Sequence, residues 1–451
     1  MLSKEIIEKY NVASPRYTSY PTILDWNQPD FDLTEFKKQL HKSFTPNQSI
    51  ETSVYIHLPF CESLCTFCGC HKYITKNHSV EEPYIETILK EWELYRSATQ
   101  SHLEVSELHL GGGTPTFFGV ESLELLLSKI TAKRAKEVNY SLEGHPNHTT
   151  LAQLNLFFKY GFRRISFGVQ DYDQEVQKAI NRIQSFEQVK KVTEQARAIG
   201  FTSISHDLVF GLPKQTMAAM KKSVELTLSL RPDNISLYSY AHVPWVKGTG
   251  QRGYSEKDLP NGETKRALYE FAKEELLKSG YLEIGMDHFG LPTEPMTKAM
   301  LNKKLNRNFM GYTTTNTERM IALGASAISE YPFGYAQNEK NVKIYQEKIN
   351  SGNLAIAKGH IHSDLDLELK THIKALMCNF ETNYENDSWI ASNQKYFKTD
   401  FENFKNDGIL KWSKNKLKVT KEGRPFVRNV CASIDPYINK KSDTPRFSKS
   451  V

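Results

Sequence analysis

Short runs of β-branched and aromatic residues alternate with amphipathic segments along the first two thirds of the chain. Segments with helical period include VEEPYIETILKEWELY, QSFEQVKKVTEQARAIG and NGETKRALYEFAKEELLKSG. The runs between such segments have the composition of buried strands: SVYIHLPF from residue 53, SELHLGGG from 106, VNYSLEGHP from 138, RRISFGVQD from 163, SISHDLVFGLP from 203 and NISLYSYAHVP from 234. This alternation predicts parallel strands joined by right-handed helical crossovers.

The residues that follow each predicted strand decide between an open sheet and a barrel. In a barrel all strand ends share one mouth, whereas the outer strands of an open sheet lie too far apart to share a site. We therefore predict an α/β fold, a partial (β/α)6-type TIM-like barrel with the functional site at its mouth. The strand-end residues are polar or glycine-rich: Cys61, GGGTPT from 111, Glu143, Gln170, Asp207, and Tyr240 with His242.

The alternation fades after about residue 290. Segments such as LELKTHIKALMCNF indicate helices there, and DG at 407 to 408 with KLKVTKEG resembles the wing of a winged-helix unit, expected to cover a pocket rather than to bind DNA. The pattern predicts three parts: an N-terminal arm covering the barrel mouth (1–50), the barrel (51–290), and a mostly helical accessory domain with a small winged β element and a basic tail (291–451).

Composition places the chain among ordinary enzymes that do not enter membranes. Charged residues make up 24% and hydrophobic residues 39% of the 451 positions, and no run approaches the roughly 18 to 20 apolar residues of a membrane span. The N-terminus lacks the features of a secretory signal, so we expect a cytoplasmic protein. The net charge of +6 is spread along the chain, which argues against nucleic acid and suits a pocket for an anionic small molecule.

The phrase CESLCTFCGC, residues 61 to 70, holds four of the six cysteines. A cytosolic chain keeps its thiols reduced, so the cluster predicts metal binding or redox chemistry rather than disulfides. The other two, Cys378 and Cys431, stand alone in apolar or mixed surroundings and are expected to be buried hydrophobic residues.

Cys61, Cys65 and Cys68 have the spacing C-x3-C-x2-C, which leaves two kinds of site open. His57 and His71 flank the cluster and would complete a zinc site. Three thiolates on one loop better suit a 4Fe–4S cluster in which one iron lacks a protein ligand and binds a small molecule.

A glycine-rich phrase, GGGTPT, follows the second predicted strand. Its chemistry indicates either a plain turn or a turn whose backbone approaches a ligand such as a phosphate. Thr114 and Pro115 are good N-cap and first-turn residues for a following helix.

The C-x3-C-x2-C loop after the first strand of a barrel resembles the radical S-adenosylmethionine superfamily. Over Tyr17 to Ser448 the chain further resembles the oxygen-independent coproporphyrinogen III oxidase family. The phrases that carry this resemblance are SPRYTSYPT, YIHLPFC, CTFCGC, HLGGGTPT, SFGVQD, DLVFGLPKQT, SYAHVP, GMDHF, NFMGYTT, GASAIS, YAQN and PRFS.

The resemblance implies a reaction of heme biosynthesis. A 5′-deoxyadenosyl radical takes hydrogen from a propionate β-carbon of coproporphyrinogen III, and carbon dioxide and one electron leave. Two such events give the vinyl groups of protoporphyrinogen IX. A low-potential electron donor of the flavodoxin or ferredoxin type is implied as partner, and we expect a monomer that contacts neither nucleic acid nor membrane.

The same resemblance implies roles for individual residues. Cys61, Cys65 and Cys68 would bind a 4Fe–4S cluster, while Cys70 and Tyr55 would be catalytic, with Cys70 no ligand. One S-adenosylmethionine would contact Tyr55, Phe67, Gly112, Glu143 and Ile328. A second would contact Gly113, Thr114, Gln170, Arg182, Asp207 and Ala241. We expect carboxylates of the substrate to meet Arg16, Arg446 and Lys449.

Two departures and two alternatives accompany this interpretation. The chain has Gly144 and His145 where many relatives have an acidic residue, and Met310 where Gln is expected. The alternatives are another radical S-adenosylmethionine enzyme that modifies tetrapyrroles by methyl transfer or ring opening, and a heme-binding chaperone. The chaperones usually lack the CGC and SPRYTSYPT phrases, which argues against the second alternative.

Overall fold

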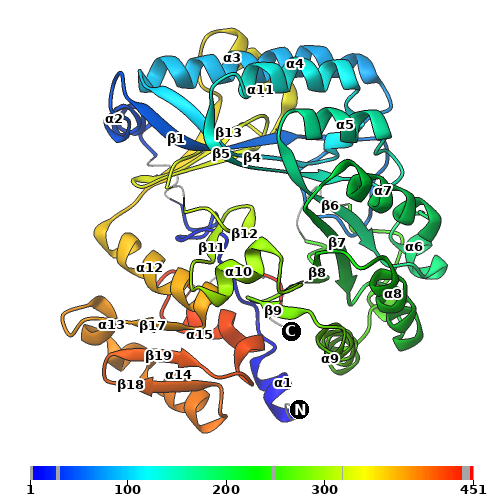
Figure 1. Cartoon of the computed structure of the whole chain (residues 1–451). Helices are drawn as coiled ribbons and strands as arrows, with labels where there is room; N and C mark the ends of the chain where they lie inside the picture. The colour runs from blue at the N-terminus through cyan, green and yellow to red at the C-terminus, as the bar shows by residue number, and fades with distance from the viewer. Residues whose placement is uncertain (1–3, 27–30, 246–249, 317, 439–446, 450–451) are drawn as a thin grey trace.

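The computed structural model describes residues 4–26, 31–245, 250–316, 318–438 and 447–449 (Figure 1). Its centre is a sheet of 12 strands in the order β16-β15-β14-β13-β1-β4-β5-β6-β7-β8-β10-β9. The strands from β1 to β8 run parallel to their neighbours, which confirms the predicted partial barrel. They are β1 (Ser49–Leu58), β4 (His102–Gly112), β5 (Arg134–Gly144), β6 (Phe162–Gln170), β7 (Ser203–Phe210) and β8 (Asn234–Ser239).

Helices between these strands cover the outside of the sheet, as Figure 1 shows. Polar side chains cap several of them, because the first backbone N–H groups of a helix lack partners within it. Thr150 and Gln153, for example, form a capping box at the start of α5. The crossover helices are α3 (Glu81–Thr99), α4 (Val120–Ile130), α5 (Leu151–Lys159), α6 (Gln174–Ala179), α7 (Phe186–Ile199) and α8 (Met217–Leu230), and α9 (Gly262–Lys278) follows β8.

The sheet continues past the boundary that the sequence suggested near residue 290. Strand β13 pairs in parallel with β1, and β14 to β16 follow it as antiparallel neighbours. These short strands have no crossover helix between them, except α11 (Val342–Asn350) before β16, so the sequence lacks the strand–helix period there. The strands are β13 (Met320–Leu323), β14 (Ile328–Tyr331), β15 (Gly334–Asn338) and β16 (Ile356–Ile361). We therefore propose that the accessory part begins after Ile361 rather than at 291.

At the other edge of the sheet, β10 (His288–Gly290) pairs antiparallel with β8 and with β9 (Leu282–Ile284). Helix α10 (Pro295–Leu301) and the hairpin of β11 (Asn306–Asn308) and β12 (Gly311–Thr313) then turn toward the inner face of the sheet (Figure 1). The Thr313 hydroxyl donates to Glu107 of β4 at 2.8 Å, which fixes the hairpin inside the barrel.

The accessory part has a core of its own around α12 and α14. It contains α12 (Asp364–Asn379), α13 (Trp389–Ser392), α14 (Gln394–Asn406) and α15 (Val427–Ser433), with a sheet of β17 (Glu381–Asn383), β19 (Lys416–Val419) and β18 (Leu410–Ser413) in that order. Cys378 and Cys431 are buried.

The N-terminal fifty residues divide between two places. Helix α1 (Lys4–Tyr10) packs on the accessory part, where the Tyr10 hydroxyl donates to Asp407 at 2.5 Å. Helix α2 (Leu33–Ser43) packs against α3, outside the barrel. The segment around Arg16, between these helices, reaches the barrel mouth. No helix within the described ranges is long and apolar enough to cross a membrane.

A buried carboxyl group ties α3 to the sheet extension. Glu91 is 0% exposed and accepts hydrogen bonds from Tyr345 Oη (2.6 Å), the Gly324 N–H (2.8 Å) and Asn338 Nδ2 (2.6 Å). Burial raises the pKa of Glu91 from 4.5 to about 7, although all three hydrogen bonds oppose the shift. The folded chain therefore binds a proton at this site more tightly than the unfolded chain does.

Glu91→Gln is expected to remove part of the pH dependence of stability. Because the folded pKa is raised, the contribution of Glu91 is fully present below pH 4.5 and is lost as the pH rises through 7. The free energy of unfolding of the wild type should thus fall by up to about 3 kcal/mol relative to the variant between pH 4.5 and 8. Urea titrations at both pH values measure the difference, and the exposed Glu93→Gln on the same helix should show none.

Candidate active site at the barrel mouth

The cysteine loop opens into a cavity of about 490 Å³ at the C-terminal ends of the parallel strands. Cys61 belongs to the short β2 (Phe60–Cys61), which pairs with β3 (Tyr73–Ile74) directly after β1. The cavity is lined by the sequence-predicted residues Cys61, Cys65, Phe67, Cys68, Cys70, Gly112, Gly113, Thr114, Glu143, Gln170, Arg182, Asp207 and Ala241. Residues from the ends of the six parallel strands thus meet around one space.

The segment after α6 holds the cysteine loop in place. The Thr66 backbone N–H donates to the Ile180 carbonyl at 3.0 Å, and Asn181 Nδ2 donates to the Leu64 carbonyl at 2.7 Å. Arg182 Nη1 donates to Cys65 Sγ at 3.7 Å. These bonds fix the loop before any cofactor binds.

The thiols of the loop differ in acidity. Burial raises the pKa of Cys61 to about 11. A hydrogen bond with Cys70 lowers the pKa of Cys68 to about 6 and raises that of Cys70 well above its ordinary value. At neutral pH Cys68 is therefore a thiolate, the form that binds metals, while Cys70 keeps its proton.

The donor set favours an iron–sulfur cluster over a single zinc ion. Both ring nitrogens of His57 are taken, Nδ1 by the Tyr55 hydroxyl at 2.9 Å and Nε2 by the His71 carbonyl at 3.0 Å. Three thiols around an open cavity fit a larger group that leaves one side free for a ligand.

The GGGTPT turn packs its backbone against the cysteine loop. The N–H of Gly113 donates to the Leu58 carbonyl at 2.9 Å, and that of Thr114 to the Phe60 carbonyl at 3.0 Å. A Cβ on Gly113 would lie 2.5 Å from the carbonyl of Pro59, so only glycine allows this approach. The close packing agrees with a turn that serves a ligand.

Thr114 takes the predicted N-cap position and Pro115 the predicted first position, but of a short 3-10 helix. Thr114 precedes only a 3-10 turn over Pro115–Phe117 and makes no side-chain cap bond, and α4 begins later, at Val120. Instead, Thr114 Oγ1 lies 3.3 Å from Cys61 Sγ. The hydroxyl thus contacts a thiol of the cluster loop, and sequence propensity alone does not show such a long-range contact.

Two carboxylates stand at neighbouring strand ends. Glu143 accepts a hydrogen bond from the N–H of Gly112 at 3.3 Å and lies 3.5 Å from His109 Nε2. Burial raises the pKa of Asp207 to about 6, and its Oδ1 is buried without a hydrogen-bond partner among the described residues. An unpartnered buried acceptor facing a cavity indicates that a ligand or water completes it.

Arg182 and Gln170 form the opposite wall. Arg182 Nη2 donates to the Gly168 carbonyl at 2.7 Å, while its Nε is buried without a partner in the described residues. Gln170 has φ +66°, a left-handed conformation that non-glycine residues rarely adopt. Such local strain is typical of residues that bind ligands.

Two predicted residues do not line the cavity. Tyr55 lies behind it and stacks on His109, with 5.9 Å between ring centroids. Ile328 is buried in a small apolar cluster with Trp26, Phe309 and Tyr335. Of the expected carboxylate partners, Arg16 lines the cavity, Lys449 is exposed beside Ala13, and Arg446 lies outside the described residues.

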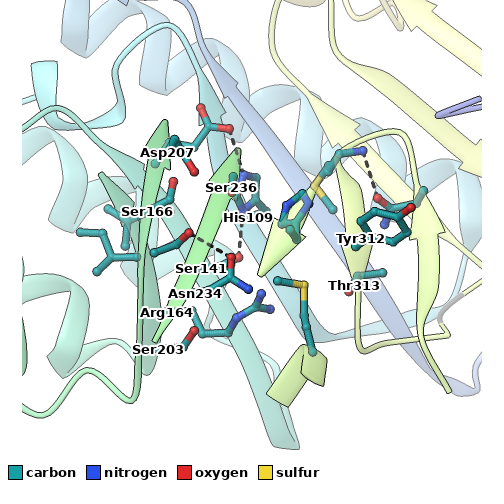
Figure 2. A pocket seen from close by; sticks show the side chains of 18 of the residues that line it. His109, Ser141, Arg164, Ser166, Ser203, Asp207, Asn234, Ser236, Tyr312 and Thr313 are labelled. Atoms are coloured by element: carbon teal, nitrogen blue, oxygen red, sulfur yellow. Dashed lines mark hydrogen bonds and ion pairs between the residues drawn. The ribbon is translucent and has the colours of Figure 1, made fainter. Parts of the chain in front are cut away.

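A second, polar cavity of about 140 Å³ continues into the barrel (Figure 2). Glu143, Ser166, Asp207 and Tyr238 line both cavities. Met310, which stands where Gln is expected in relatives, lines the inner cavity, so this difference in sequence lies inside the barrel. His145 lines the mouth, and burial lowers its pKa to about 2, which makes it a neutral side chain.

The inner cavity contains residues that the sequence interpretation missed. His109, Ser141, Arg164 and Asn234 point into it from four different strands (Figure 2). Side chains alternate between the two faces of β6, so Arg164, Ser166 and Gly168 share one face. This alternation in the sequence could have predicted that Arg164 and Ser166 point into the barrel.

Comparisons with known proteins agree with this geometry. A model of the "Radical SAM superfamily" matches residues 55–227. Proteins named "Oxygen-independent coproporphyrinogen III oxidase" from Pseudomonas aeruginosa and Escherichia coli are 35% and 34% identical, and each match covers 99% of this chain and 98% of the relative. The solved structure of the coproporphyrinogen III oxidase from Escherichia coli, described as a radical SAM enzyme, superimposes with a TM-score of 0.88 at 32% identity, covering 97% of this chain and 99% of that one.

Proposed function

The chain belongs to the oxygen-independent coproporphyrinogen III oxidases of the radical S-adenosylmethionine superfamily, and we propose that its mouth cavity oxidatively decarboxylates two propionates of coproporphyrinogen III. The product is protoporphyrinogen IX, and the reaction is a step of heme biosynthesis. The observation that supports this most is the convergence of three loop thiols, a glycine turn, Glu143, Arg182 and Asp207 on one cavity.

Family membership implies a 4Fe–4S cluster and S-adenosylmethionine, and the residues present fit both. Cys61, Cys65 and Cys68 would bind the cluster. When bound, the cluster and S-adenosylmethionine supply the one-electron chemistry that takes a hydrogen atom from the propionate β-carbon, after which carbon dioxide and one electron leave the substrate.

The chain's own residues orient the reactants and exclude water. The N–H of Gly112 and the carboxylate of Glu143 fix one side of the cofactor site through their mutual bond of 3.3 Å. Cys70 holds a proton beside Cys68, and Tyr55, hydrogen-bonded to His57, supports the wall behind Glu143. We assign Cys70 a catalytic role on the family pattern. Tyr55, for which the same pattern implies a catalytic role, does not line the cavity, so we assign it a positioning role through its bond to His57.

We further propose that two molecules of S-adenosylmethionine bind. One would contact Phe67, Gly112 and Glu143, and the other Gly113, Thr114, Gln170, Arg182, Asp207 and Ala241, whereas Tyr55 and Ile328, expected at the first molecule, do not line the cavity. The volume of about 490 Å³ at the mouth and the unpartnered polar atoms on both Arg182 and Asp207 support a second ligand.

Arg182→Leu is expected to lower the number of S-adenosylmethionine molecules bound from two to one per cluster, because it removes the cation from the second site. Equilibrium dialysis with labelled S-adenosylmethionine measures this number, and iron content checks the cluster. Lys178→Leu, at an exposed position of α6 four residues before Arg182, serves as the control. A wild type that binds a single molecule would contradict the two-molecule proposal.

The cellular setting is also a proposal. A low-potential flavodoxin or ferredoxin would supply the electron, and the chain would act as a cytoplasmic monomer without nucleic acid or membrane. The net charge of +6, spread along the chain, suits a pocket for an anionic small molecule better than a nucleic-acid surface.

An anaerobic assay tests the function. The protein is reconstituted with iron and sulfide, reduced, and given S-adenosylmethionine with coproporphyrinogen III. Carbon dioxide, protoporphyrin and 5′-deoxyadenosine are followed by mass spectrometry. Vinyl product formed with 5′-deoxyadenosine supports the proposal. Stoichiometric heme binding without turnover would favour a chaperone, and 5′-deoxyadenosine without vinyl product would favour another substrate.

A further inference from the structure

Two segments near the termini, around Ser14 and Ser448, meet around one buried arginine. Arg428, 3% exposed, donates to the backbone carbonyls of Ser14, Pro15, Ser448 and Lys449, with a distance of 2.9 Å from Nε to the Pro15 oxygen. The N–H of Ser14 donates to the Ser448 carbonyl at 3.2 Å. Arg428 thus holds the N-terminal and C-terminal segments together.

The N-terminal segment places Arg16 at the mouth cavity. Arg16 Nη2 donates to the Ser239 carbonyl at 2.8 Å, at the end of β8. The next residue, Tyr17, has φ +45°, a strained conformation held by a hydrogen bond to Asp435 at 3.0 Å. Arg307 Nη2 donates to the Arg16 carbonyl at 3.2 Å. The hydrogen bonds of Asp435 and Arg307 therefore hold the strained backbone of Tyr17, and with it the position of Arg16.

Lys265 reaches the same place from α9. Its Nζ donates at 3.1 Å to the carbonyl of Tyr240, the residue after Ser239. Its stem crosses Gly211, which has φ +83° and where a Cβ would lie 2.7 Å from Lys265 Cε. Glycine at this position therefore leaves the room that Lys265 occupies, and Arg16 and Lys265 bind consecutive carbonyls at the end of one strand.

The surroundings of this pair are strongly cationic. Burial, followed by the charges of Arg16, Arg428 and Lys449, lowers the pKa of Lys265 to about 7. Burial and the charge of Arg16 lower that of Arg428 to about 9. The negative charge of the Asp287 carboxylate acts in the opposite direction and raises the pKa of Arg428. Cations gathered in a partly buried site repel one another and bind an anion strongly.

We propose that Arg16 and Lys265 bind a propionate carboxylate of the tetrapyrrole that stays on the ring while another propionate reacts. This inference rests on the proposed function. A reacting carboxylate leaves as neutral carbon dioxide and loses its charge in the transition state, so cations paired with it would stabilise the substrate more than the transition state. A remaining carboxylate keeps its charge throughout, and its binding positions the macrocycle.

The position of the pair agrees with this role. Strand β8 stands at the far end of the parallel run from β1, with β4, β5, β6 and β7 between them. The cysteine loop follows β1, and Ser239, Tyr240 and Arg16 line the same cavity as the cysteines. A macrocycle lying across the mouth can therefore present one propionate to the cofactors and another to Arg16, with Lys265 behind the cavity wall at the Tyr240 carbonyl.

Kinetics of Arg16→Gln and Lys265→Gln test the proposal in the reconstituted enzyme. Each loses a charge-assisted hydrogen bond, so KM for coproporphyrinogen III should rise about 10- to 100-fold while kcat changes little. Arg16→Lys, which keeps the charge, should recover most of the affinity. Lys278→Gln, an exposed change at the end of the same helix α9, should leave KM unchanged. Iron content should equal that of the wild type in all four.

The outcomes separate this inference from the function on which it rests. A wild type that forms protoporphyrin, together with Lys265→Gln and Arg16→Gln variants of unchanged KM, would overturn the carboxylate site alone. A fall in kcat with no change in KM would also overturn it, because positioning by binding predicts the opposite. A wild type that releases no carbon dioxide from coproporphyrinogen III would overturn both. If Arg16→Gln does not fold, Lys265→Gln decides.

Discussion

Cys65→Ser is expected to remove most of the iron and to lower turnover at least about a thousandfold, since serine cannot supply the thiolate that an iron–sulfur cluster requires. Cys65 lies in the loop that Thr66 and Asn181 fix, so the fold around it should persist. Iron and sulfide analysis of the reconstituted variant and the anaerobic assay for protoporphyrin measure the two effects.

Cys70→Ser, two positions beyond the last proposed ligand, is the matched comparison. Cys70 keeps its proton because it hydrogen-bonds to Cys68. Its replacement should therefore leave the iron content intact and lower turnover about a hundredfold, the range for loss of a group that holds or transfers a proton. Loss of iron equal to that in Cys65→Ser would contradict the assignment of Cys70 as a residue that does not bind the cluster.

The sequence predicted those parts of the molecule that depend on local pattern. The parallel strands from β1 to β8 are long and alternate with amphipathic helices, so periodicity alone indicates the barrel. The spacing of Cys61, Cys65 and Cys68 lies within one loop and could be recognised for the same reason. Most of the predicted site residues line one cavity because they follow successive strands that end at one mouth.

The parts of the molecule that the sequence did not predict depend on contacts between distant segments. Strands β13 to β16 are short, and their membership of the sheet is decided by pairing with β1 rather than by their own pattern. Lys265 is one of many lysines on amphipathic helices, and only the fold shows that it bends across Gly211 to the end of β8. Arg428 likewise gains its role from the carbonyls of Pro15 and Lys449, which lie far apart in the sequence.

Gly113→Ala is expected to abolish binding of S-adenosylmethionine and to lower turnover by more than about a hundredfold. The added Cβ would meet the carbonyl carbon and oxygen of Pro59 at 2.5 Å and the Leu58 oxygen at 2.9 Å, all of them backbone atoms that cannot rotate away. The turn must then move, and a shift of about 1 Å in a positioning element costs about a hundredfold in rate. Equilibrium dialysis with S-adenosylmethionine and the anaerobic assay measure the effect.

Gly119→Ala gives the control within the same segment. Its backbone has φ −64°, and a Cβ there would lie 3.5 Å or more from the carboxylates of Glu81 and Glu121, which is ordinary contact. The N–H of Gly119 would still donate to Glu81. This variant should bind S-adenosylmethionine and turn over like the wild type. If both variants behave alike, the effect comes from flexibility of the segment, whereas a loss confined to Gly113→Ala shows that the backbone contact between the glycine turn and the cysteine loop shapes the cofactor site.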